Sequence, residues 1–588
     1  MVVKFSLAVL TGTVLTLGGL PVGLAAQTVP PPNPTREEID RAPIASVPPS
    51  AGQRVTVENG IEAAPCPLAA DEFKDINIKI DRVDFGDLKG VDGAMLQPAY
   101  GQYLGQTVPI ATVCTIRDGA ATILRRKGYL AAVQVPPQKI ENGTIKFDVL
   151  FAKLVGFQVR GNVGKAERII SNYLEAIKQQ PIFNVIEAER YLLLARDLPG
   201  YDVRLTLRPA GTGPGEVIGD VKVNFTPVQA DFNVQNYGSK AVGRIGGITQ
   251  VRLNGLLGAG DRTTLGFYAT SDFKEQIVGQ LGEELRLGSN GLTLISSATY
   301  AITKPTIGNG NALTSKTLIG NLALRYPVVR AQSNNVSLSG GVDYIDQRAR
   351  VGDALITNDK LRVIYAKVDV DAIDSASLSS TIGYSASEPR WRTLGSLELR
   401  KGVGALGGSL RCGTLIACPS RAQGNGKAFV ARVSAIGEFR PIPKLAFTLA
   451  PRVQYSRRAL LSYEEFSTGN YTVGRGYDPG VLSGDSGIGV SGEIKLGSIV
   501  PRSIKSLAIQ PYVFGDAAFV WNRDSDLRGL NPQRLYSAGG GIRASYGQRI
   551  SLDVGAAVPL KRAGLQTQRS DVRLLASLSV KFLPWNRR

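Results

Sequence analysis

The 588-residue chain contains no histidine, only two methionines and only four cysteines. Histidine is the side chain used most often for acid–base catalysis near neutral pH, and it is also the commonest metal ligand. Its absence therefore excludes the usual catalytic triads and zinc sites. The sequence also lacks a G-x-x-x-x-G-K-[ST] phosphate loop. We expect a protein that is not an enzyme, with no cofactor and no metal site.

After the N-terminal segment, the sequence contains no stretch of 18 or more apolar residues. This argues against membrane-spanning helices but is compatible with a membrane β-barrel. Residues 1–26 combine Lys4, an apolar stretch and the small residues Ala25 and Ala26, which is typical of a secretory signal peptide. The net charge of +19 is spread along the chain without a basic run, so we expect no nucleic-acid partner. A basic lumen and loops facing anionic lipopolysaccharide explain the charge better.

The four cysteines, an even number in a secreted chain, indicate two disulfides formed in an oxidising compartment. Cys412 and Cys418 flank a five-residue stretch in a Gly-rich segment and are expected to pair. Cys66 and Cys114 would then form the second bond. Free buried thiols are the alternative.

Residues 27–75 are interpreted as Pro-rich linkers around one short helix. The sequence Thr35-Arg36-Glu37-Glu38 has the spacing of a capping box and predicts a helix from Thr35 to about Arg41. Residues 76–153 then predict a strand, two helices (about 95–104 and 113–126) and two strands (about 130–135 and 144–154). The same order recurs over residues 154–224. Two tandem α+β modules of this size are typical of binding arms.

Residues 225–588 change to short alternating segments separated by Gly, Asn, Asp and Ser. In Val572 to Phe582, for example, one face carries apolar residues and the other carries Arg573, Ser577 and Lys581. An apolar face opposite a charged face is the pattern of a barrel in a membrane, because a dry sandwich core would not accept the charges. An 11-residue strand tilted by roughly 45° spans about 25 Å. We predict an all-β membrane barrel of about sixteen antiparallel strands.

Several motifs now resemble those of the two-partner secretion transporters of the haemolysin secretion/activation type. The most specific is YTVGRGYDPGVLSGDSG, residues 471–487, which resembles the sixth loop of that family with Arg475-Gly476-Tyr477 at its tip. Asn254 to Asp261 and Phe514 to Ala518 resemble further barrel motifs, although Ala518 stands where the family usually has Gly. The resemblance covers nearly the whole mature chain.

The resemblance implies that both modules are POTRA modules in the periplasm and that the barrel lies in the bacterial outer membrane. It also implies that the sixth loop folds into the lumen, where Arg475 would meet Asp516. The site residues expected from it are the loop residues Gly474, Gly476, Tyr477, Asp478 and Gly480 and the strand residues Phe514 and Ala518.

The expected function is export of a large secreted exoprotein, expected to be β-helical once folded, which the modules would bind in extended form. Outer-membrane lipid and lipopolysaccharide are the other expected partners of a monomeric barrel. The alternatives are an insertase that assembles other barrels, a passive porin or a surface adhesin. A porin or an adhesin would not need tandem periplasmic modules.

Overall fold

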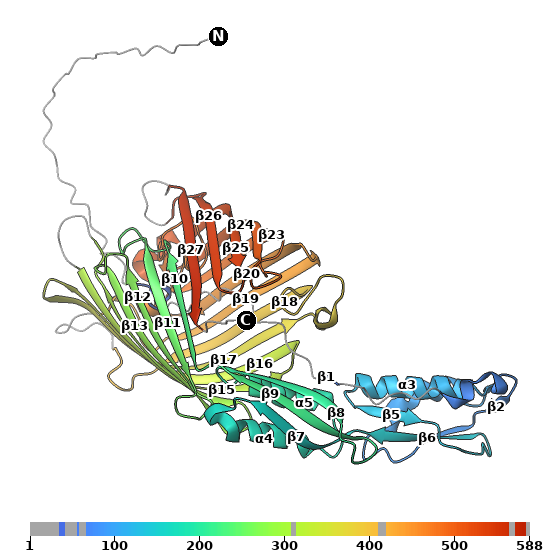
Figure 1. The fold of residues 1–588 in the computed structure, drawn as a ribbon. Coiled ribbons are helices and arrows are strands. Elements are labelled where there is room, and N and C mark those ends of the chain that lie inside the picture. The colour runs from blue at the N-terminus through green and yellow to red at the C-terminus, as the bar shows by residue number, and fades with distance from the viewer. Residues whose placement is uncertain are drawn as a thin grey trace, which may run out of the picture. The chain divides into compact units, whose positions relative to one another are not determined.

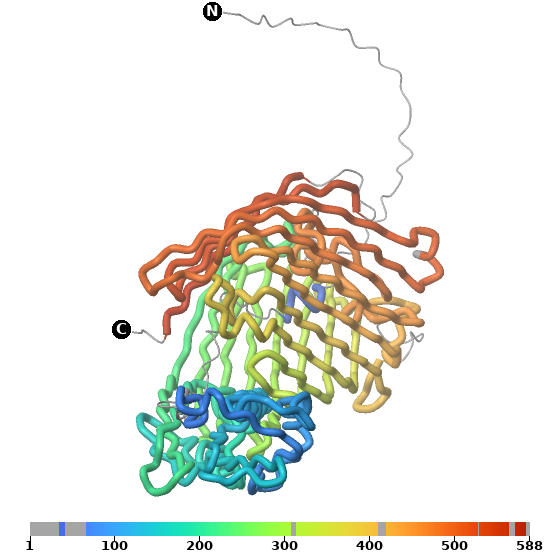
Figure 2. The backbone as a smooth tube through the Cα atoms, turned by 90° about the vertical axis from the view of Figure 1, so that its right-hand side faces the viewer, coloured from blue at the N-terminus to red at the C-terminus, as the bar shows by residue number. Residues whose placement is uncertain are grey.

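The computed structural model describes residues 34–40, 56–57, 66–306, 313–409, 419–563 and 571–583. The expected signal peptide, residues 1–26, and the expected pair Cys412 and Cys418 lie outside these ranges. Figures 1 and 2 show the arrangement of the elements. None of the helices in the described ranges is long and apolar enough to cross a membrane.

Helix α1 (Arg36–Ile39) begins at the predicted capping box. The Glu38 carboxylate accepts the backbone N–H of Thr35 at 2.9 Å, and the Thr35 hydroxyl accepts the N–H of Glu38 at 3.3 Å. This pair satisfies two backbone donors that the first turn of a helix leaves open. The helix is shorter than expected, because Asp40 leaves the helical region of backbone angles at φ −87° and ψ 70°.

The first module contains β2 (Asn77–Lys79), β3 (Arg82–Phe85), α2 (Gln97–Tyr100), β4 (Thr107–Pro109), α3 (Thr112–Arg126), β5 (Ala131–Gln134) and β6 (Thr144–Phe151). Its main sheet has the order β3-β6-β5, with β3 parallel to β6, and β2 pairs with β4 separately. The helix predicted near residues 95–104 is broken into α2 and two flanking 3₁₀ turns, Gly93–Leu96 and Gly101–Tyr103. Gly and Pro residues in this stretch, including Pro98, weaken a continuous helix.

The second module repeats the plan with β7 (Lys153–Gly161), α4 (Glu167–Lys178), α5 (Val185–Arg196), β8 (Tyr201–Pro209) and β9 (Glu216–Phe225). Its sheet order is β1-β8-β9-β7, in which β1 (Thr56–Val57) is a piece of the preceding linker that pairs in parallel with β8. The strand expected over residues 144–154 is divided at Ala152 between β6 and β7.

The junction between the modules is held by backbone contacts. The N–H of Val185 donates to the carbonyl of Gly128 at 2.8 Å, and the side chain of Asn184 donates to Lys127 at 3.2 Å. Gly128 has φ +86°, and a Cβ there would lie 2.5 Å from the Asn184 Oδ1 atom. Glycine is therefore required where the two modules meet.

The remaining strands close into one antiparallel barrel in the order β10 to β20, then β23 to β27, with β27 paired to β10. The strands are β10 (Val228–Gln235), β11 (Gly246–Asn254), β12 (Arg262–Thr270), β13 (Gln276–Leu287), β14 (Leu292–Thr303), β15 (Leu313–Arg330), β16 (Asn334–Val351), β17 (Ala354–Ile373), β18 (Trp391–Gly402), β19 (Phe429–Ile442), β20 (Leu445–Ser456), β23 (Ser486–Leu496), β24 (Leu507–Trp521), β25 (Gln533–Tyr546), β26 (Ile550–Pro559) and β27 (Arg573–Leu583). These sixteen strands confirm the predicted architecture.

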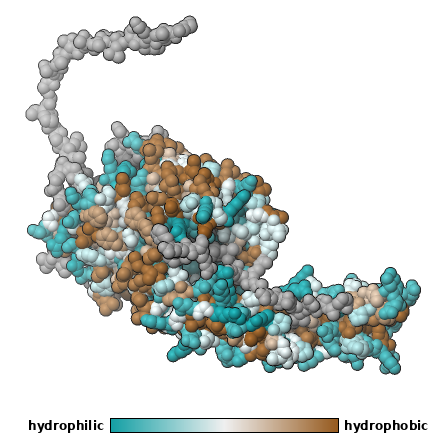
Figure 3. All heavy atoms as spheres, in the orientation of Figure 1, coloured by the Kyte–Doolittle hydropathy of each residue, from teal (hydrophilic) through white to brown (hydrophobic). Residues whose placement is uncertain are grey.

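The two faces of the barrel wall differ in polarity as the alternation predicted. Leu574, Leu578 and Phe582 of β27 are exposed on the outside, whereas Arg573 is buried on the inside. Figure 3 shows hydrophobic residues gathered over the barrel wall. Exposed apolar side chains over so large an area require an apolar solvent, which a bilayer supplies.

Candidate functional site

The segment 457–485 between β20 and β23, here called loop 6, folds back against the barrel wall. It contains the short strands β21 (Phe466–Ser467) and β22 (Ser483–Gly484), which pair with each other. At its tip Tyr477 is fully buried, and its hydroxyl lies 2.9 Å from the carbonyl of Tyr536 and 2.6 Å from that of Lys561. These contacts fix the tip against β25 and the chain that follows β26.

Two glycines allow the tip to approach the wall so closely. Gly474 has φ +112°, a backbone conformation that side chains rarely adopt. A Cβ on Gly476 would lie 2.8 Å from the backbone nitrogen of Pro559. The motif therefore supplies glycine where backbone meets backbone.

Arg475, between these glycines, contacts Asp516 on β24. Its Nη2 lies 2.7 Å from Oδ1, and its Nε and backbone N–H donate to Oδ2 at 3.2 and 2.9 Å. The Ser537 hydroxyl donates to the same Oδ2 at 3.0 Å. The Asp516 side chain is fully buried. A bidentate, charge-assisted contact of this kind combines strength with a defined geometry.

The neighbours of Arg475 extend this contact along the wall. Its guanidinium lies 3.5 Å above the ring of Phe514, and its Nη1 lies 2.5 Å from Glu493 on β23. Arg543 on β25 donates to both oxygens of Glu493, at 2.9 and 3.1 Å. Ala518 is fully buried in one apolar cluster with Tyr477, so the wall accommodates the methyl group that replaces the family's glycine.

Helix α1 lies inside the barrel, where Figure 2 shows it within the ring of strands. Ile39 is fully buried in a cluster with Ile345 and Leu361 of the wall. Glu37 lies 3.2 Å from Arg452 on β20. On the loop side, a Cβ on Gly480 would lie 3.0 Å from the Thr35 side chain, so loop 6 and α1 are in contact. Together they occupy the interior of the barrel.

A cavity of about 1410 Å³ leads to loop 6. Residues of the second module, among them Tyr173 and Arg196, line one part of it, and Arg452, Arg475 and Glu493 line another. Because the same cavity reaches the second module and Arg475, a chain entering from the module would meet loop 6.

The second module is joined to the barrel by a bidentate ion pair. Asp197, directly after α5, accepts Nε and Nη2 of Arg330 at the end of β15, each at 2.7 Å. Beside it the Glu189 carboxylate accepts the backbone N–H of Gln332 at 2.7 Å. These contacts place α5 against the turn between β15 and β16.

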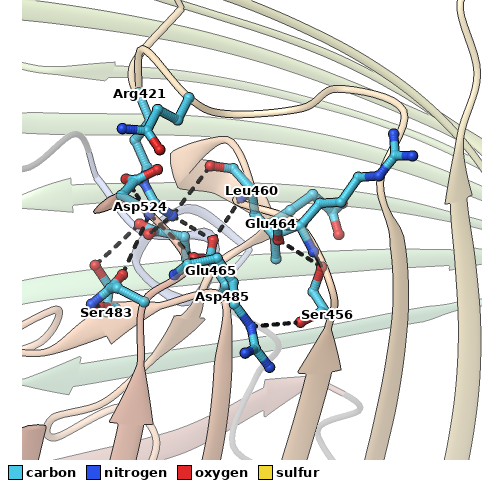
Figure 4. Close-up of polar contacts among 12 residues, drawn as sticks. Arg421, Ser456, Leu460, Glu464, Glu465, Ser483, Asp485 and Asp524 are labelled. Atoms are coloured by element: carbon cyan, nitrogen blue, oxygen red, sulfur yellow. Dashed lines mark hydrogen bonds and ion pairs between the residues drawn. The ribbon is translucent and has the colours of Figure 1, made fainter. Parts of the chain in front are cut away.

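A second ion cluster, which sequence reasoning missed, joins three loops (Figure 4). Arg421, between β18 and β19, lies 2.5 Å from Glu465 and 2.6 Å from Asp485, both in loop 6. Its Nε donates at 2.8 Å to Asp524, which follows β24. Asp485 is fully buried and also accepts the N–H groups of Leu460 and Arg523, each at 2.6 Å. One guanidinium therefore holds the base of loop 6 between its two neighbouring loops.

Glu465 belongs to this cluster and lies in loop 6, outside the spanning strands. Burial raises the pKa of Glu465 to about 7, and the nearby Asp485 and Asp524 act in the same direction against Arg421. Desolvation and like charges both disfavour the ionised form of a carboxyl group. The cluster is therefore most stable when Glu465 is protonated.

Cys66 and Cys114 form a disulfide, with 5.9 Å between their Cα atoms. Cys114 lies on α3, so the bond fixes the segment that enters the first module. In the described ranges no group of three or more Asp, Glu or Cys side chains is arranged to hold a metal ion.

Comparison with known proteins gives consistent matches. The family model described as haemolysin secretion/activation protein ShlB/FhaC/HecB matches residues 220–544, and the model described as POTRA domain, ShlB-type, matches residues 78–151. The heme/hemopexin transporter protein HuxB of Haemophilus influenzae (strain 86-028NP) is 22% identical over 522 residues, which cover 85% of this chain and 86% of HuxB.

Two solved structures share the fold. CdiB from Escherichia coli matches with a TM-score of 0.68 and 15% identity over 89% of this chain and 94% of CdiB. CdiB from Acinetobacter baumannii matches with a TM-score of 0.62 and 18% identity over 90% and 95% of the two chains.

Proposed function

The chain belongs to the haemolysin secretion/activation protein family ShlB/FhaC/HecB, and on that premise we propose how it moves its partner. It is an outer-membrane two-partner secretion transporter whose POTRA modules lie in the periplasm, and its partner is a secreted exoprotein. The proposal concerns the form in which this exoprotein is bound and the elements that move to let it pass.

The exoprotein binds in extended form by adding a strand to an open edge of a POTRA sheet. In the described chain β3 and β5 are the two edges of the first sheet, and β7 is an edge of the second. Main-chain hydrogen bonds at such an edge give affinity without demanding one sequence. This suits a large polypeptide, β-helical once folded, that must present many different segments in turn. The barrel acts as a monomer, among lipid and lipopolysaccharide.

The bound segment then enters the cavity of about 1410 Å³ and reaches the closed part of the lumen. Passage requires α1 to leave, which breaks the Glu37–Arg452 ion pair and exposes the buried Ile39. It also requires loop 6 to move, which breaks the contact of Arg475 with Asp516. Folding of the exoprotein outside the cell supplies the direction; the sequence contains no G-x-x-x-x-G-K-[ST] phosphate loop.

The single observation that carries the proposal is the cavity that runs from the second module to Arg475. The test compares the culture medium of cells with and without the protein. We expect one large polypeptide to disappear from the medium when the gene is deleted and to return on complementation. A chain lacking residues 76–224 should not restore it, whereas restoration by that truncated chain would support a passive pore instead.

A further inference from the structure

The seam between β10 and β27 is shorter than the strands that form it. The paired residues run from Ala230 with Leu583, through a register shift before Asp231, to Gln235 with Ser577, so the start of β27 extends beyond the last pair. There the side chain of Asn236 continues the ladder. It accepts the N–H of Ala576 at 2.8 Å and donates to the carbonyl of Leu574 at 2.9 Å. The backbone N–H of Asn236 also donates to the carbonyl of Ala576, at 3.1 Å, so this one residue extends the pairing with both its backbone and its side chain.

Asp478 of loop 6 lies beyond this amide and contacts both sides of the seam. Its Oδ1 lies 2.6 Å from the Arg573 guanidinium at the start of β27. The same oxygen lies 3.4 Å from the guanidinium of Arg244, in the loop between β10 and β11. Its Oδ2 accepts the backbone N–H of Lys240, in that same loop, at 3.2 Å. Because β10 directly follows the second module, this is the end of the seam remote from the periplasm.

The Asp478 carboxylate balances the positive charges of two arginines, Arg573 and Arg244. The ion pairs that Arg573 and Arg244 form within the described chain are both with Asp478. The Arg573 side chain is only 6% exposed, so water compensates little for a lost partner. Without Asp478, two guanidinium groups would face each other across the seam, and like charges at short range repel.

We propose that Asp478 is a clasp that holds the outer end of the β10–β27 seam closed for as long as loop 6 occupies the lumen. Gly476 and Asp478 lie next to a cavity of about 400 Å³, lined also by Asn236 and Leu574, which gives the strand ends room to separate. When loop 6 moves, Asp478 leaves with it. This end of the seam then keeps the hydrogen bond from Arg573 to the carbonyl of Gly238, at 3.2 Å, but loses the carboxylate that joins Arg573 to Arg244. The clasp is distinct from the Arg475 contact, which ties loop 6 to β24 on another part of the wall. This inference rests on the proposed function in one respect only, because both require loop 6 to move.

The test uses the full chain in planar bilayers with a cysteine staple across the seam. Val234→Cys and Leu578→Cys join residues that are register partners, in a background of Cys412→Ser and Cys418→Ser. We expect Asp478→Ala to raise the frequency of channel openings about tenfold, as for loss of one partner of a buried charge pair. Oxidation of the staple should return the frequency to the wild-type value. Arg475→Ala, which removes the contact of loop 6 with Asp516 on β24, should also raise the opening frequency, and oxidation of the staple should not lower it, because that contact lies away from the seam.

Two further variants separate the clasp from a general loss of structure. Asp478→Asn keeps an oxygen acceptor but removes the charge and should give an intermediate rise in opening. The exchange Asp478→Arg with Arg573→Asp restores opposite charges across the seam and should bring the opening frequency within about threefold of wild type. A rise in Asp478→Ala that persists in the oxidised staple would overturn the proposal, as would an unchanged opening frequency in that variant. Conductance is read without the exoprotein, so failure of the secretion proposal would leave this result interpretable.

Discussion

Arg475 and Asp516 are joined by three hydrogen bonds, two from the guanidinium and one from the backbone N–H of Arg475. Asp516 is therefore held by the backbone of loop 6 as well as by the side chain of Arg475. The neighbouring Glu493 takes the remaining guanidinium nitrogen. This contact ties the loop to β23 and β24 together.

Substitution of Asp516 by Ala should free loop 6 and raise channel conductance while it lowers secretion about tenfold or more, since a buried, hydrogen-bonded charge pair loses one partner. Single-channel recording and quantification of the secreted exoprotein measure the two effects. Arg475→Lys is the matched control, because it keeps the charge but not the bidentate geometry. Its conductance and its secretion should both lie between those of the wild type and those of Arg475→Ala. Unchanged conductance together with undiminished secretion in Asp516→Ala would contradict a role for this contact in closure.

The Arg421 cluster should make closure of loop 6 depend on pH. Because the pKa of Glu465 is raised to about 7, its contribution to the closed form is complete below its ordinary pKa and is lost as pH rises through about 7. The groups that face it are Arg421, Asp485 and Asp524. We expect the opening frequency to rise about tenfold between pH 5.5 and pH 8. Glu465→Gln should remove most of this rise and keep the frequency low, and an identical pH profile in that variant would argue against the assignment.

Removal of the Cys66–Cys114 disulfide should destabilise the first module. The bond closes a loop with a sequence separation of 48 residues. Bonds of this kind typically contribute about 2–5 kcal/mol, largely by restricting the unfolded chain. The loss of stability is measured on the full chain carrying Cys66→Ser and Cys114→Ser. The chain is unfolded chemically, and proteolysis within residues 76–153 reports unfolding of the first module. The barrel should keep its resistance to proteolysis, which serves as the internal control.

The ion pair between Asp197 and Arg330 should contribute to the position of the second module. Both side chains are partly exposed, at 34% and 21%, so we expect a coupling energy of only about 1 kcal/mol in a double-mutant cycle. Secretion should nevertheless fall severalfold in Asp197→Ala, because α5 loses its anchor on the turn after β15. The matched control is Asp202→Ala, which removes a more exposed pair with Arg204. Equal effects of the two substitutions would show that the anchor has no special role.

Much of the architecture could be predicted from local pattern. The alternation of Leu574, Leu578 and Phe582 with Arg573 identifies both a strand and its lipid-facing side, because side chains on a strand alternate between faces. The resemblance in residues 471–487 led to Arg475 and to the strand residue Asp516, and the structure places the two in contact. The tandem order of strands and helices in residues 76–224 likewise predicts the two modules.

The Arg421 cluster could not be found in this way. Arg421 lies in a Gly-rich loop without periodicity, and its partners are 44, 64 and 103 residues away in the sequence. A contact among three loops produces no recognisable pattern in the sequence of any one of those loops. Asp478 was recognised as a motif residue, but its position across the seam depends on how the barrel closes, which no local pattern encodes.

The pairing of β1 with β8 limits how far the lumenal helix can travel. The chain from Ile39 to Thr56 covers 17 residue steps, so it reaches at most about 60 Å when fully extended. Were β1 to detach, the next fixed point would be the disulfide at Cys66, and the reach would grow to roughly 95 Å. The pairing of Thr56 and Val57 with the edge of the second sheet thus sets the greatest distance that α1 can move from the periplasmic modules.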